Sequence, residues 1–470
     1  MFIGREFEME KLNRLYGEKG FQMPVIYGRR RVGKTRLIRE FCTGKRTVFY
    51  ASIEQNDSEA LRMFSDEVLR SLPGKQSSFI SSFDSWDSAF RYVADFAREE
   101  RIVLVIDEFP YIASANPSLP SILQKAIDHY FSGTQLFLIL CGSSMSFMEH
   151  QVLDYKSPLY GRRTAQFKIQ PLDCFDSMKF FPGWKGHEQL YGYGITGGIP
   201  QYLLAAGRHG SFRQAVEEEF LTGTGVLFEE PANLMKQEMR EPAVYNSILR
   251  AIAGGASRQA EISTKVGMPS KSVANYLKAL IDLEIIQKDY PFGDNNSRKV
   301  VYRVKDQLFR FWYRFIPGAM SLIGMGMPDE AFEKMIAPHF SDYFGPVFED
   351  ICRQYLVRLN RQKKLRTVYR EFARWWGSDP ETRQQEEIDI VGSDTEWALF
   401  GECKWKGEKT GLREMEKLQK RSMLLLRDKK REYCLFSRAG FTEGLRKEAD
   451  KMGEMGNIAL IGLEELLGEK

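Results

Sequence analysis

The sequence predicts an α/β protein that begins with a parallel sheet flanked by helices and ends with another α/β domain. Over the first 170 residues, strand-like apolar runs alternate with helical patterns, which is typical of parallel sheets covered by helices. Two more strand-like runs, at 387–391 and 399–405, follow a long and mainly helical region. The length of 470 residues allows roughly two to four domains and so accommodates both parts.

Composition narrows the functional classes. Hydrophobic residues make up 43% of the chain, enough for a substantial core, and the formal charge of +4 is close to balance. That balance does not mark the whole chain as a polyanion binder, so a nucleic-acid surface has to come from local patches. The six cysteines are scattered without a C-x-x-C pattern and are expected to be buried thiols. With no signal-like N-terminus and no long apolar run, we expect a soluble cytoplasmic protein without a membrane partner.

The first elements surround a glycine-rich loop. A helix is predicted at about 6–16, a buried strand at 24–27, and a second helix from Thr35 onward. Between strand and helix lies a complete G-x-x-x-x-G-K-[ST] motif, whose backbone N–H groups can surround the phosphates of a nucleotide placed at the helix N-terminus. Lys34 can reach the β- and γ-phosphates, and the Thr35 hydroxyl can bind Mg²⁺. The predicted nucleotide-binding residues of the motif are Gly28, Arg29, Arg30, Arg31, Val32, Gly33, Lys34 and Thr35.

The remaining strands of the first sheet are predicted at 47–51, 102–106, 136–140 and 166–169. The run at 102–106 is continuously apolar, as in a strand buried on both faces, and it ends in Asp107 and Glu108. We expect Asp107 to join the Mg²⁺ shell and Glu108 to orient and polarise the attacking water. An ordinary acidic turn is the alternative, but the phosphate-binding motif upstream argues against it.

Two further features of this part have open interpretations. The strand at 136–140 leads into Ser143, whose hydroxyl can touch the γ-phosphate or the water, or can simply belong to the strand exit. Arg162 and Arg163 precede the last strand. Their guanidinium groups can stabilise transition-state charge within one subunit or in a neighbouring one, and a solvated basic turn is the alternative.

Several ordered motifs resemble one known family. They are 2–6, 28–35, Ile-Asp-Glu-Phe at 106–109, Gly-Ser-Ser at 142–144, 158–163 and Thr-Gly-Gly-Ile-Pro at 196–200. Together they are similar to the archaeal-type ATPases within the AAA+/STAND group of signal-transducing P-loop ATPases. The resemblance implies an AAA+-like ATPase core at 1–170, a helical lid at 171–238 and a winged helix at 239–305. It also implies that Arg5 lies near the adenine and that Pro200 begins a segment that closes over the base. From the residues alone, 197–200 is only a turn signal.

The winged-helix region shows its own pattern. Helices are predicted at 245–252, 259–266 and 271–283, the last one capped by Ser270, and strands at 285–290 and 299–304 with a tip at 293–297. The third helix of such a fold can enter a major groove. It exposes only Lys271, Asn275 and Lys278 as obvious contacts, so we favour a packing and coupling role over DNA binding.

Residues 306–330 are expected to form an aromatic seam and a linker. Aromatic and arginine side chains alternate over 306–315, and such rings can stack on bases, although a seam between domains is the interpretation that we favour. Pro317 and Gly318 are expected to end this helix, because proline lacks an N–H group and glycine loosens the backbone.

Four ionisable residues stand out in the last domain, 331–470. Glu349 lies in a helical pattern, Asp389 in the strand at 387–391, and Glu402 and Lys404 in the strand at 399–405. A turn at 392–395 pairs the two strands as an antiparallel hairpin. Glu402 and Lys404 are two residues apart on a strand and therefore face the same side, where Asp389 can join them.

This group suits phosphodiester chemistry. Asp389 and Glu402 offer hard oxygen ligands for Mg²⁺ or Mn²⁺, Lys404 can steady developing charge, and Glu349 can steer a second ion or the water. The order resembles the PD-(D/E)xK nuclease superfamily, with Ile388 where that pattern has proline. The resemblance to archaeal-type ATPases reinforces it, because those often end in a nuclease-like domain. A solvated hairpin is the alternative. Seven Lys and Arg residues and no acidic residue occupy 351–370, which fits either phosphate contacts or an exposed basic face.

The sequence therefore predicts a P-loop AAA+-like sheet core with a helical lid, a winged helix and a restriction-nuclease-like α/β domain. The predicted protein binds and hydrolyses ATP with Mg²⁺, and its nucleotide state controls a domain that acts on DNA or other nucleic acid. The rival hypothesis is a nucleotide-gated regulatory switch with an inactive nuclease fold. Whether the protein forms a homo-oligomer is left open.

Overall fold

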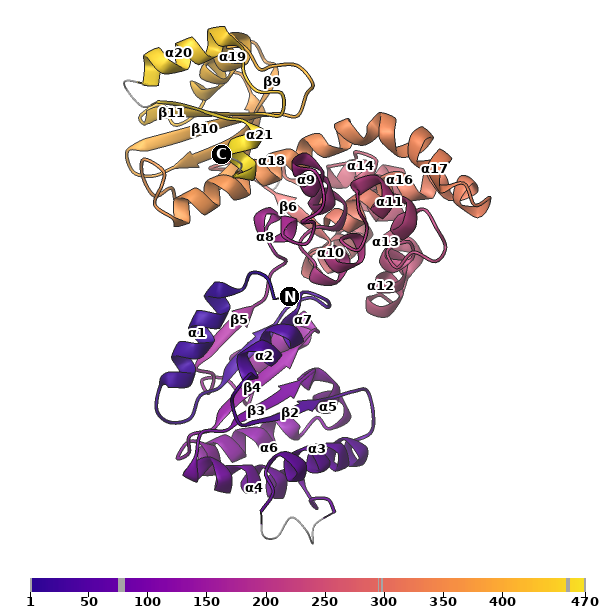
Figure 1. Cartoon of the computed structure of the whole chain (residues 1–470), viewed down its shortest axis with the longest axis vertical. Coiled ribbons are helices and arrows are strands. Elements are labelled where there is room, and N and C mark those ends of the chain that lie inside the picture. The colour runs from indigo at the N-terminus through magenta and orange to yellow at the C-terminus, as the bar shows by residue number, and fades with distance from the viewer. Residues whose placement is uncertain (1, 75–80, 295, 297–298, 454–456, 469–470) are drawn as a thin grey trace. The chain divides into compact units, whose positions relative to one another are not determined.

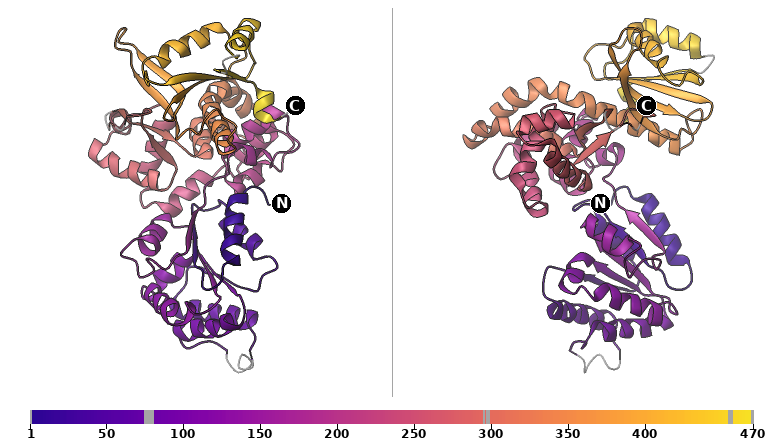
Figure 2. Two further views of the ribbon diagram at one scale, coloured as in Figure 1. Left: turned by 90° about the vertical axis from the view of Figure 1, so that its left-hand side faces the viewer. Right: turned by 180° about the vertical axis from the view of Figure 1, so that it is seen from behind.

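The computed structural model describes residues 2–74, 81–294, 296, 299–453 and 457–468 (Figures 1 and 2). The chain forms two compact units. The N-terminal unit comprises Met1–Leu172 together with Ile199–Gln201, and the C-terminal unit comprises Asp173–Gly198 and Tyr202–Lys470. Within the described ranges, no helix is long and apolar enough to cross a membrane.

The N-terminal unit is built on a five-stranded parallel sheet in the order β2-β3-β4-β1-β5. The predicted strands are all present, with ends shifted by one or two residues at most. β1, β3 and β4 are buried along their whole length, as expected where helices cover both faces. The strands are β1 (Pro24–Tyr27), β2 (Thr47–Ala51), β3 (Val103–Asp107), β4 (Phe137–Gly142) and β5 (Ala165–Lys168).

Helices connect these strands and form the outer layers of the unit (Figure 1). The long α3 and α4 bury one apolar face each and begin at side-chain caps, Asn56 and Ser85, whose oxygens accept backbone N–H groups of the first turn. The helices are α1 (Glu6–Gly17), α2 (Lys34–Cys42), α3 (Asp57–Ser71), α4 (Trp86–Glu99), α5 (Phe109–Ala115), α6 (Leu119–Ala126), η2 (Ile127–Phe131), α7 (Met145–Phe147) and η3 (Met148–Leu153).

The C-terminal unit begins with helices and a short hairpin. Three helices followed by an antiparallel pair occur in the predicted order, but Ser270 is the first residue of its helix and not the cap, and its oxygen accepts from Gln259 instead. Asn295 and Ser297 of the predicted tip lie outside the described residues. The elements are α8 (Cys174–Met178), α9 (Gly186–Thr196), α10 (Pro200–Ala206), α11 (Phe212–Phe220), α12 (Glu230–Glu238), α13 (Pro242–Ala253), α14 (Gln259–Val266), α15 (Ser270–Asp282), β6 (Ile286–Asp289) and β7 (Val301–Val304).

The helix α16 (Gln307–Gly324) corrects one prediction, because it continues through Pro317. Phe315 and Ile316 before the proline and Ala319 after it are all buried, so packing on both sides outweighs the missing N–H group. The aromatic face of α16 packs on α9 and α13. A short break then leads into α17 (Pro328–Ala331), η5 (Phe332–Ile336) and the long α18 (Ala337–Arg361).

The chain ends in a mixed sheet of order β12-β11-β10-β9-β8. β8, β9 and β10 are antiparallel neighbours, which confirms the predicted hairpin, and β10, β11 and β12 are parallel. The elements are β8 (Phe372–Ser378), β9 (Gln385–Ser393), β10 (Trp397–Lys404), α19 (Leu412–Ser422), β11 (Lys430–Ser437), α20 (Glu443–Gly453), β12 (Ile458–Ile461) and α21 (Leu463–Leu467).

The short hairpin β6–β7 is joined to this terminal sheet. Phe292 donates its N–H to the Arg374 carbonyl at 2.9 Å, and its ring belongs to the core formed by β9 and β10. The Trp376 indole donates to the Lys299 carbonyl at 3.2 Å. The loop between β6 and β7 and the terminal sheet therefore pack against each other.

Candidate nucleotide-binding and carboxylate sites

The glycine-rich loop turns sharply between β1 and α2, and two of its glycines are required by the backbone. Gly28 has a φ of 151°, and a Cβ atom there would lie 2.5 Å from the Ile169 carbonyl oxygen. Gly33 caps α2 with a φ of 92°, a conformation that L side chains rarely adopt. The motif therefore has the strand–loop–helix setting that phosphate binding requires.

Lys34 is folded back onto the loop. Its side chain is buried, and Nζ donates to the carbonyls of Gly28 and Arg29, at 2.9 Å each. Burial lowers the pKa of Lys34, while the nearby Cys141, Glu108 and Asp107 oppose that shift. An incoming phosphate would offer this ammonium group charged acceptors in place of neutral carbonyls, which strengthens its hydrogen bonds.

The carboxyl ends of β3 and β4 bring the predicted acidic and hydroxyl groups to the loop. The Thr35 hydroxyl donates to Asp107 Oδ2 at 2.7 Å, and Asp107 is only 3% exposed. Glu108 Oε2 accepts from both the N–H and the hydroxyl of Ser143, at 3.0 and 2.9 Å. The structure thus places Thr35, Asp107, Glu108 and Ser143 in one cluster.

This cluster fits a magnesium ion. The Thr35 hydroxyl and the Asp107 carboxylate are hard oxygen donors in direct contact, and Mg²⁺ in phosphate sites commonly uses one or two such protein ligands. The residues present therefore suit the metal that the sequence predicts.

Arg5 and Pro200 also lie at the loop, although they are distant in sequence. Arg5 Nη2 donates to the carbonyls of Val32, at 3.0 Å, and Gln170, at 2.7 Å. A Cβ atom on Gly33 would lie 3.6 Å from Pro200 Cγ. Both residues thus lie beside the phosphate-binding loop, and their contacts with the base of a nucleotide stay a prediction.

The loop arginines are held by neighbours that the sequence analysis did not single out. Arg29 is buried, and Arg30 Nη2 donates to the Tyr111 hydroxyl at 3.2 Å. Ser52 at the end of β2 donates its hydroxyl to the Glu108 carbonyl at 2.5 Å. Ser52 could have been predicted from the sequence, because polar residues at the carboxyl ends of parallel strands meet at one sheet edge. No pattern in the sequence points to Tyr111.

Arg162 and Arg163 lie at the opposite edge of the sheet. Thr164 N–H donates to the Met23 carbonyl at 3.0 Å, so the pair is level with the start of β1, whereas the loop follows its end roughly 16 Å away. Arg162 is also bound to Asp128 by two contacts of 2.9 and 2.7 Å, which lower the pKa of that carboxyl. The structure does not bring these two residues to the loop of the same unit.

In the C-terminal unit, α18, β9 and β10 bring together the four predicted residues Glu349, Asp389, Glu402 and Lys404. Asp389 Oδ2 accepts from the Cys403 N–H at 2.8 Å, and Lys404 Nζ forms an ion pair with Glu402 Oε1. Glu402 is 6% exposed, and its Oε2 has no hydrogen-bond partner among the residues that the structure describes.

The charges of this carboxylate cluster are strongly coupled. Burial raises the pKa of Asp389 well above its ordinary value, and the nearby Glu402 and Glu349 raise it further. Burial also raises the pKa of Glu349, opposed by Arg374. Burial works to lower the pKa of Lys404, but the contact with Glu402 leaves it raised. Three carboxylates and the cations Lys404, Arg374 and Arg421 thus share this site, and burial favours the neutral form of Asp389.

A full ligand set for a second metal is not assembled. Across the described parts of the chain, no group of three or more His, Cys, Asp or Glu side chains is arranged to hold a metal ion. The reason is visible locally: Asp389 is turned to a backbone N–H, and Glu402 Oε1 faces Lys404 and, at 3.7 Å, Arg421. The buried Glu402 Oε2, which has no hydrogen-bond partner among the described residues, could still accept a metal ion.

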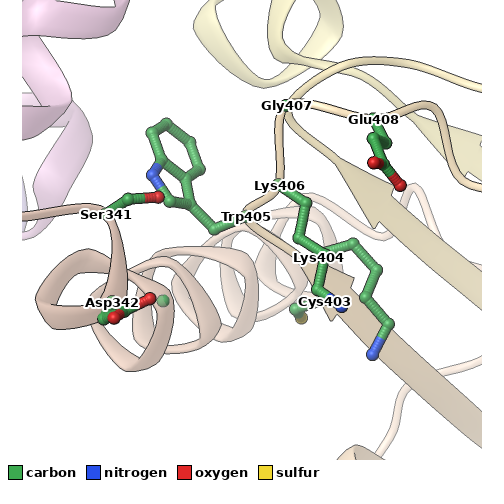
Figure 3. A pocket seen from close by; sticks show the side chains of 9 residues that line it. Ser341, Asp342, Cys403, Lys404, Trp405, Lys406, Gly407 and Glu408 are labelled. Carbon is green, nitrogen blue, oxygen red and sulfur yellow. The ribbon is translucent and has the colours of Figure 1, made fainter.

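A pocket of about 700 Å³ opens beside these residues (Figure 3). Lys404 and Lys406 extend from the end of β10 along one side, and Ser341 and Asp342 lie on the neighbouring α18. Lys404 therefore belongs both to the carboxylate cluster and to a solvent-open cavity that a substrate could enter.

Two family descriptions match separate parts of the chain. Residues 2–206 match the family described as "ATPase domain predominantly from Archaea". Residues 312–418 match the family described as "Archaea bacterial proteins of unknown function". The first match covers the glycine-rich loop and the Asp107 cluster, while the second includes Glu349, Asp389, Glu402 and Lys404 without assigning them an activity.

Individual relatives extend the likeness beyond the first domain. The uncharacterized protein MJECL04 of Methanocaldococcus jannaschii is 33% identical over 409 residues, which cover 86% of this chain and 88% of that protein. The uncharacterized ATP-binding protein MJ0423 of the same organism is 46% identical over 46 residues, covering 10% of this chain and 78% of that one. The Walker-type ATPase PABY2304 of Pyrococcus abyssi is 22% identical with a TM-score of 0.52, covering 67% of this chain and 96% of its own, and shares the fold.

Proposed function

The chain belongs to a family of archaeal P-loop ATPases, and we propose from this premise that Lys34, Thr35 and Asp107 bind the ATP phosphates with their metal while Glu108 activates the water. The contact that carries this proposal is the 2.7 Å hydrogen bond between the Thr35 hydroxyl and Asp107, which joins the phosphate-binding loop to the acidic end of β3. Hydrolysis of ATP follows the family, and the roles of individual residues are our assignment.

Each side chain has a distinct task. Lys34 exchanges the carbonyls of Gly28 and Arg29 for phosphate oxygens. Glu108, held by Ser143, orients and polarises the attacking water. Mg²⁺ held by Thr35 and Asp107 would supply positive charge against the phosphate oxygens. Arg5 and Pro200 close the loop from two sides and fit contacts with the base and its surroundings.

Calorimetry with Mg²⁺ and ATP on the full chain tests the binding site. Lys34→Ala should weaken binding roughly 10- to 100-fold, because a charge-assisted hydrogen bond to phosphate is lost. Lys19→Ala, at an exposed position, is the matched control and should bind like the parent chain. Equal affinity of the two variants would end the assignment of Lys34.

The nucleotide state is proposed to control the C-terminal unit through the segment Ile199–Gln201. This segment belongs to the N-terminal unit, yet the chain on either side of it, Asp173–Gly198 and Tyr202 onward, belongs to the C-terminal unit. Movement of Pro200 with the phosphate-binding loop is therefore transmitted along the backbone to α9 and α10.

For the C-terminal unit we propose a nuclease-like domain that acts on nucleic acid. Three features support this: the element order α18-β8-β9-β10-α19-β11, the cluster of Glu349, Asp389, Glu402 and Lys404, and the adjacent pocket. Exposed cations at the end of α18, among them Arg361, Lys363 and Lys364, fit contacts with phosphates.

The rival function is a nucleotide-gated switch with an inactive nuclease fold. The specific observation that favours it is the pairing of Glu402 with Lys404 and Arg421, which leaves two carboxylates and no three-ligand metal cluster among the described residues. In such a switch the domain would bind nucleic acid or another partner without cutting it.

Plasmid nicking with Mg²⁺ or Mn²⁺ separates the two. If the cluster is catalytic, Glu402→Ala should abolish nicking that the parent chain and Glu416→Ala, an exposed control on α19, both show. Nicking that is absent from the parent chain, or equal in all three proteins, favours the switch.

A homo-oligomer is proposed as the setting in which Arg162 or Arg163 contributes. The pair lies far from the loop of its own unit, so a contact with nucleotide requires a neighbouring copy. Sedimentation of the full chain with and without ATP and Mg²⁺ tests this, and a monomer under both conditions contradicts it.

A further inference from the structure

A second pocket, of about 340 Å³, lies within the C-terminal unit between the end of α13, β7 of the hairpin, α16 and α18. Three of its lining residues are arginines, Arg303 from β7 and Arg310 and Arg314 from α16, and one is acidic, Asp342 from α18. It is distinct from the carboxylate cluster, although Asp342 also lines the larger pocket beside Lys404.

The three arginines are not equivalent. Arg303 is neutralised by two carboxylates: its Nε lies 2.5 Å from Asp289, and its two terminal nitrogens lie 2.9 and 3.0 Å from Asp350. Arg310 and Arg314 form no ion pair among the residues that the structure describes, although Arg310 is near enough to Asp350 to help lower the pKa of that carboxyl. They are four residues apart on one helix and therefore lie on the same face, one turn from each other.

Arg310 is also incompletely satisfied. Its Nη1 is covered from solvent and has no hydrogen-bond partner among the described residues, and its guanidinium group lies 5.7 Å from the centre of the Tyr343 ring. A covered N–H donor without an acceptor costs free energy, and a small turn of the guanidinium group toward an anion in the pocket would recover it. An anion is the acceptor that a guanidinium group binds most strongly.

We propose that this pocket binds a small phosphate-bearing ligand, with Arg310 and Arg314 contacting its phosphate group. A planar guanidinium fork matches the oxygens of a phosphate, and a second arginine one turn away can share its charge. The volume lies at the small end of the range for ligand pockets, which fits a metabolite-sized phosphate ester and not a long strand. Asp342 accepts a hydrogen bond from a hydroxyl or amino group of the same ligand.

The site adds a second, independent input to the proposed switch. It lies where the hairpin, α16 and α18 meet, so a ligand held there would stiffen the link between the helical part and the terminal sheet. Its existence does not depend on whether Glu402 is catalytic.

Calorimetry with inorganic pyrophosphate on the full chain tests the proposal. The Lys34→Ala background weakens phosphate binding at the competing phosphate-binding loop. In that background we expect measurable binding that Arg310→Gln with Arg314→Gln weakens by at least about tenfold. Arg413→Gln, an exposed control on α19, should leave it unchanged, and the lysine pair Arg310→Lys with Arg314→Lys should fall between.

Three results would overturn the proposal. They are no heat with pyrophosphate in the Lys34→Ala background, equal binding after the double glutamine change, and binding of a single-stranded oligonucleotide without binding of pyrophosphate. The glutamine variants with Lys34 intact should melt at the same temperature as the parent chain and bind ATP with the same affinity. These two controls show that the fold and the ATPase site are unaffected. A failure of the arginine pocket can then be distinguished from a failure of the ATPase assignment.

Discussion

Glu108 shows how a single residue links the sheet to its chemistry. It has a φ of 55° and a ψ of 46°, a left-handed conformation that is rare for a residue other than glycine. The contacts from Ser52 to its carbonyl and from Ser143 to its carboxylate hold it there. Strain kept in place by several neighbours is typical of functional positions.

Replacing Glu108 with glutamine should separate binding from hydrolysis. The amide keeps the size of the side chain and can still accept from Ser143, but it cannot polarise water as a carboxylate does. We expect ATP hydrolysis to fall by about 100-fold or more while ATP affinity stays within a few-fold of the parent. Phosphate release and calorimetry measure the two quantities. Glu10→Gln, exposed on α1, is the control, and equal loss of binding and hydrolysis would contradict the assigned role.

Asp389 carries a pH-dependent contribution to stability. Because its pKa is raised in the folded state, its contribution is fully present below the ordinary carboxyl pKa and is lost as pH rises through the folded value. Asp389→Asn keeps an acceptor for the Cys403 N–H and removes the charge. The variant should therefore melt at a higher temperature than the parent at pH 8, by roughly 2–4 °C per kcal/mol of relieved repulsion.

The same difference should shrink as the pH is lowered from 8 toward the ordinary carboxyl range, because the parent carboxyl takes up its proton on the way. Thermal melting across this pH range measures it, and Asp450→Asn on α20 serves as an exposed control that should show no such trend. A stabilisation that is constant with pH, or a destabilisation at pH 8, would show that Asp389 is not strained by its charged neighbours.

Candidate site residues could be predicted from the sequence where they follow a motif or the end of a strand. Asp107, Glu108 and Ser143 were predicted because each follows an apolar strand-like run downstream of the phosphate-binding motif, and the structure brings them together at one edge of the sheet. Arg374 and Arg421, which neutralise the carboxylate cluster, were not found, because they come from β8 and α19 and reach the cluster only through tertiary packing.

Among the elements, the hairpin β6–β7 connects the two parts of the C-terminal unit. Burial works to raise the pKa of Asp350, but Arg303 and Arg353 outweigh it and lower that pKa to about 2. Arg303 is therefore the central cation of an ion-pair network between β7 and α18, and its removal would leave Asp289 and Asp350 with one partner fewer.

Arg303→Ala should destabilise the C-terminal unit by roughly 2–3 kcal/mol, less than for a fully buried pair because 26% of its side chain remains exposed. Lys447→Ala, which breaks an exposed pair with Glu443 on α20 of the same unit, should cost less than about 0.5 kcal/mol. Urea unfolding followed by tryptophan fluorescence suits the measurement, because six of the seven tryptophans lie in this unit. Similar costs for both variants would contradict a structural role for the network.

Two differences between sequence and structure belong to this scale. Pro317 has a strong local preference for ending a helix, but burial of Phe315, Ile316 and Ala319 outweighs it. Ser270 has a strong local preference for capping a helix, but its hydroxyl accepts from Gln259 instead. Local signals fail where packing supplies more free energy than the backbone preference costs.

For the whole molecule, the path of the chain matters most. It leaves the C-terminal unit after Gly198, contributes Ile199–Gln201 to the N-terminal unit, and returns at Tyr202. The proposed nucleotide-dependent changes at the loop would therefore have a covalent route to α9 and α10. The alternation of strands and helices predicted the first sheet. No local sequence pattern predicts that Ile199–Gln201 belong to a different unit from the residues on either side.

Pro200→Gly should weaken this route, because glycine removes the ring that lies near Gly33 and loosens the segment. We expect ATP affinity to fall by no more than about tenfold, since one apolar contact of this size is worth roughly 1 kcal/mol. ATP-dependent hydrogen-exchange protection of α9 and α10 should disappear. Pro242→Gly, at the start of α13, is the control and should keep it. Protection that survives in Pro200→Gly would place the coupling elsewhere.

The ring of Phe292 has a consequence for how such chains diversify. It projects from the hairpin tip into the interior shared by β9 and β10, so the terminal domain lacks part of its own core without the preceding module. If recombination replaced this domain with an unrelated one, the Phe292 ring would be exposed to solvent. The new domain would have to bury the ring, or a polar side chain would have to replace it. The two modules are therefore expected to be inherited together.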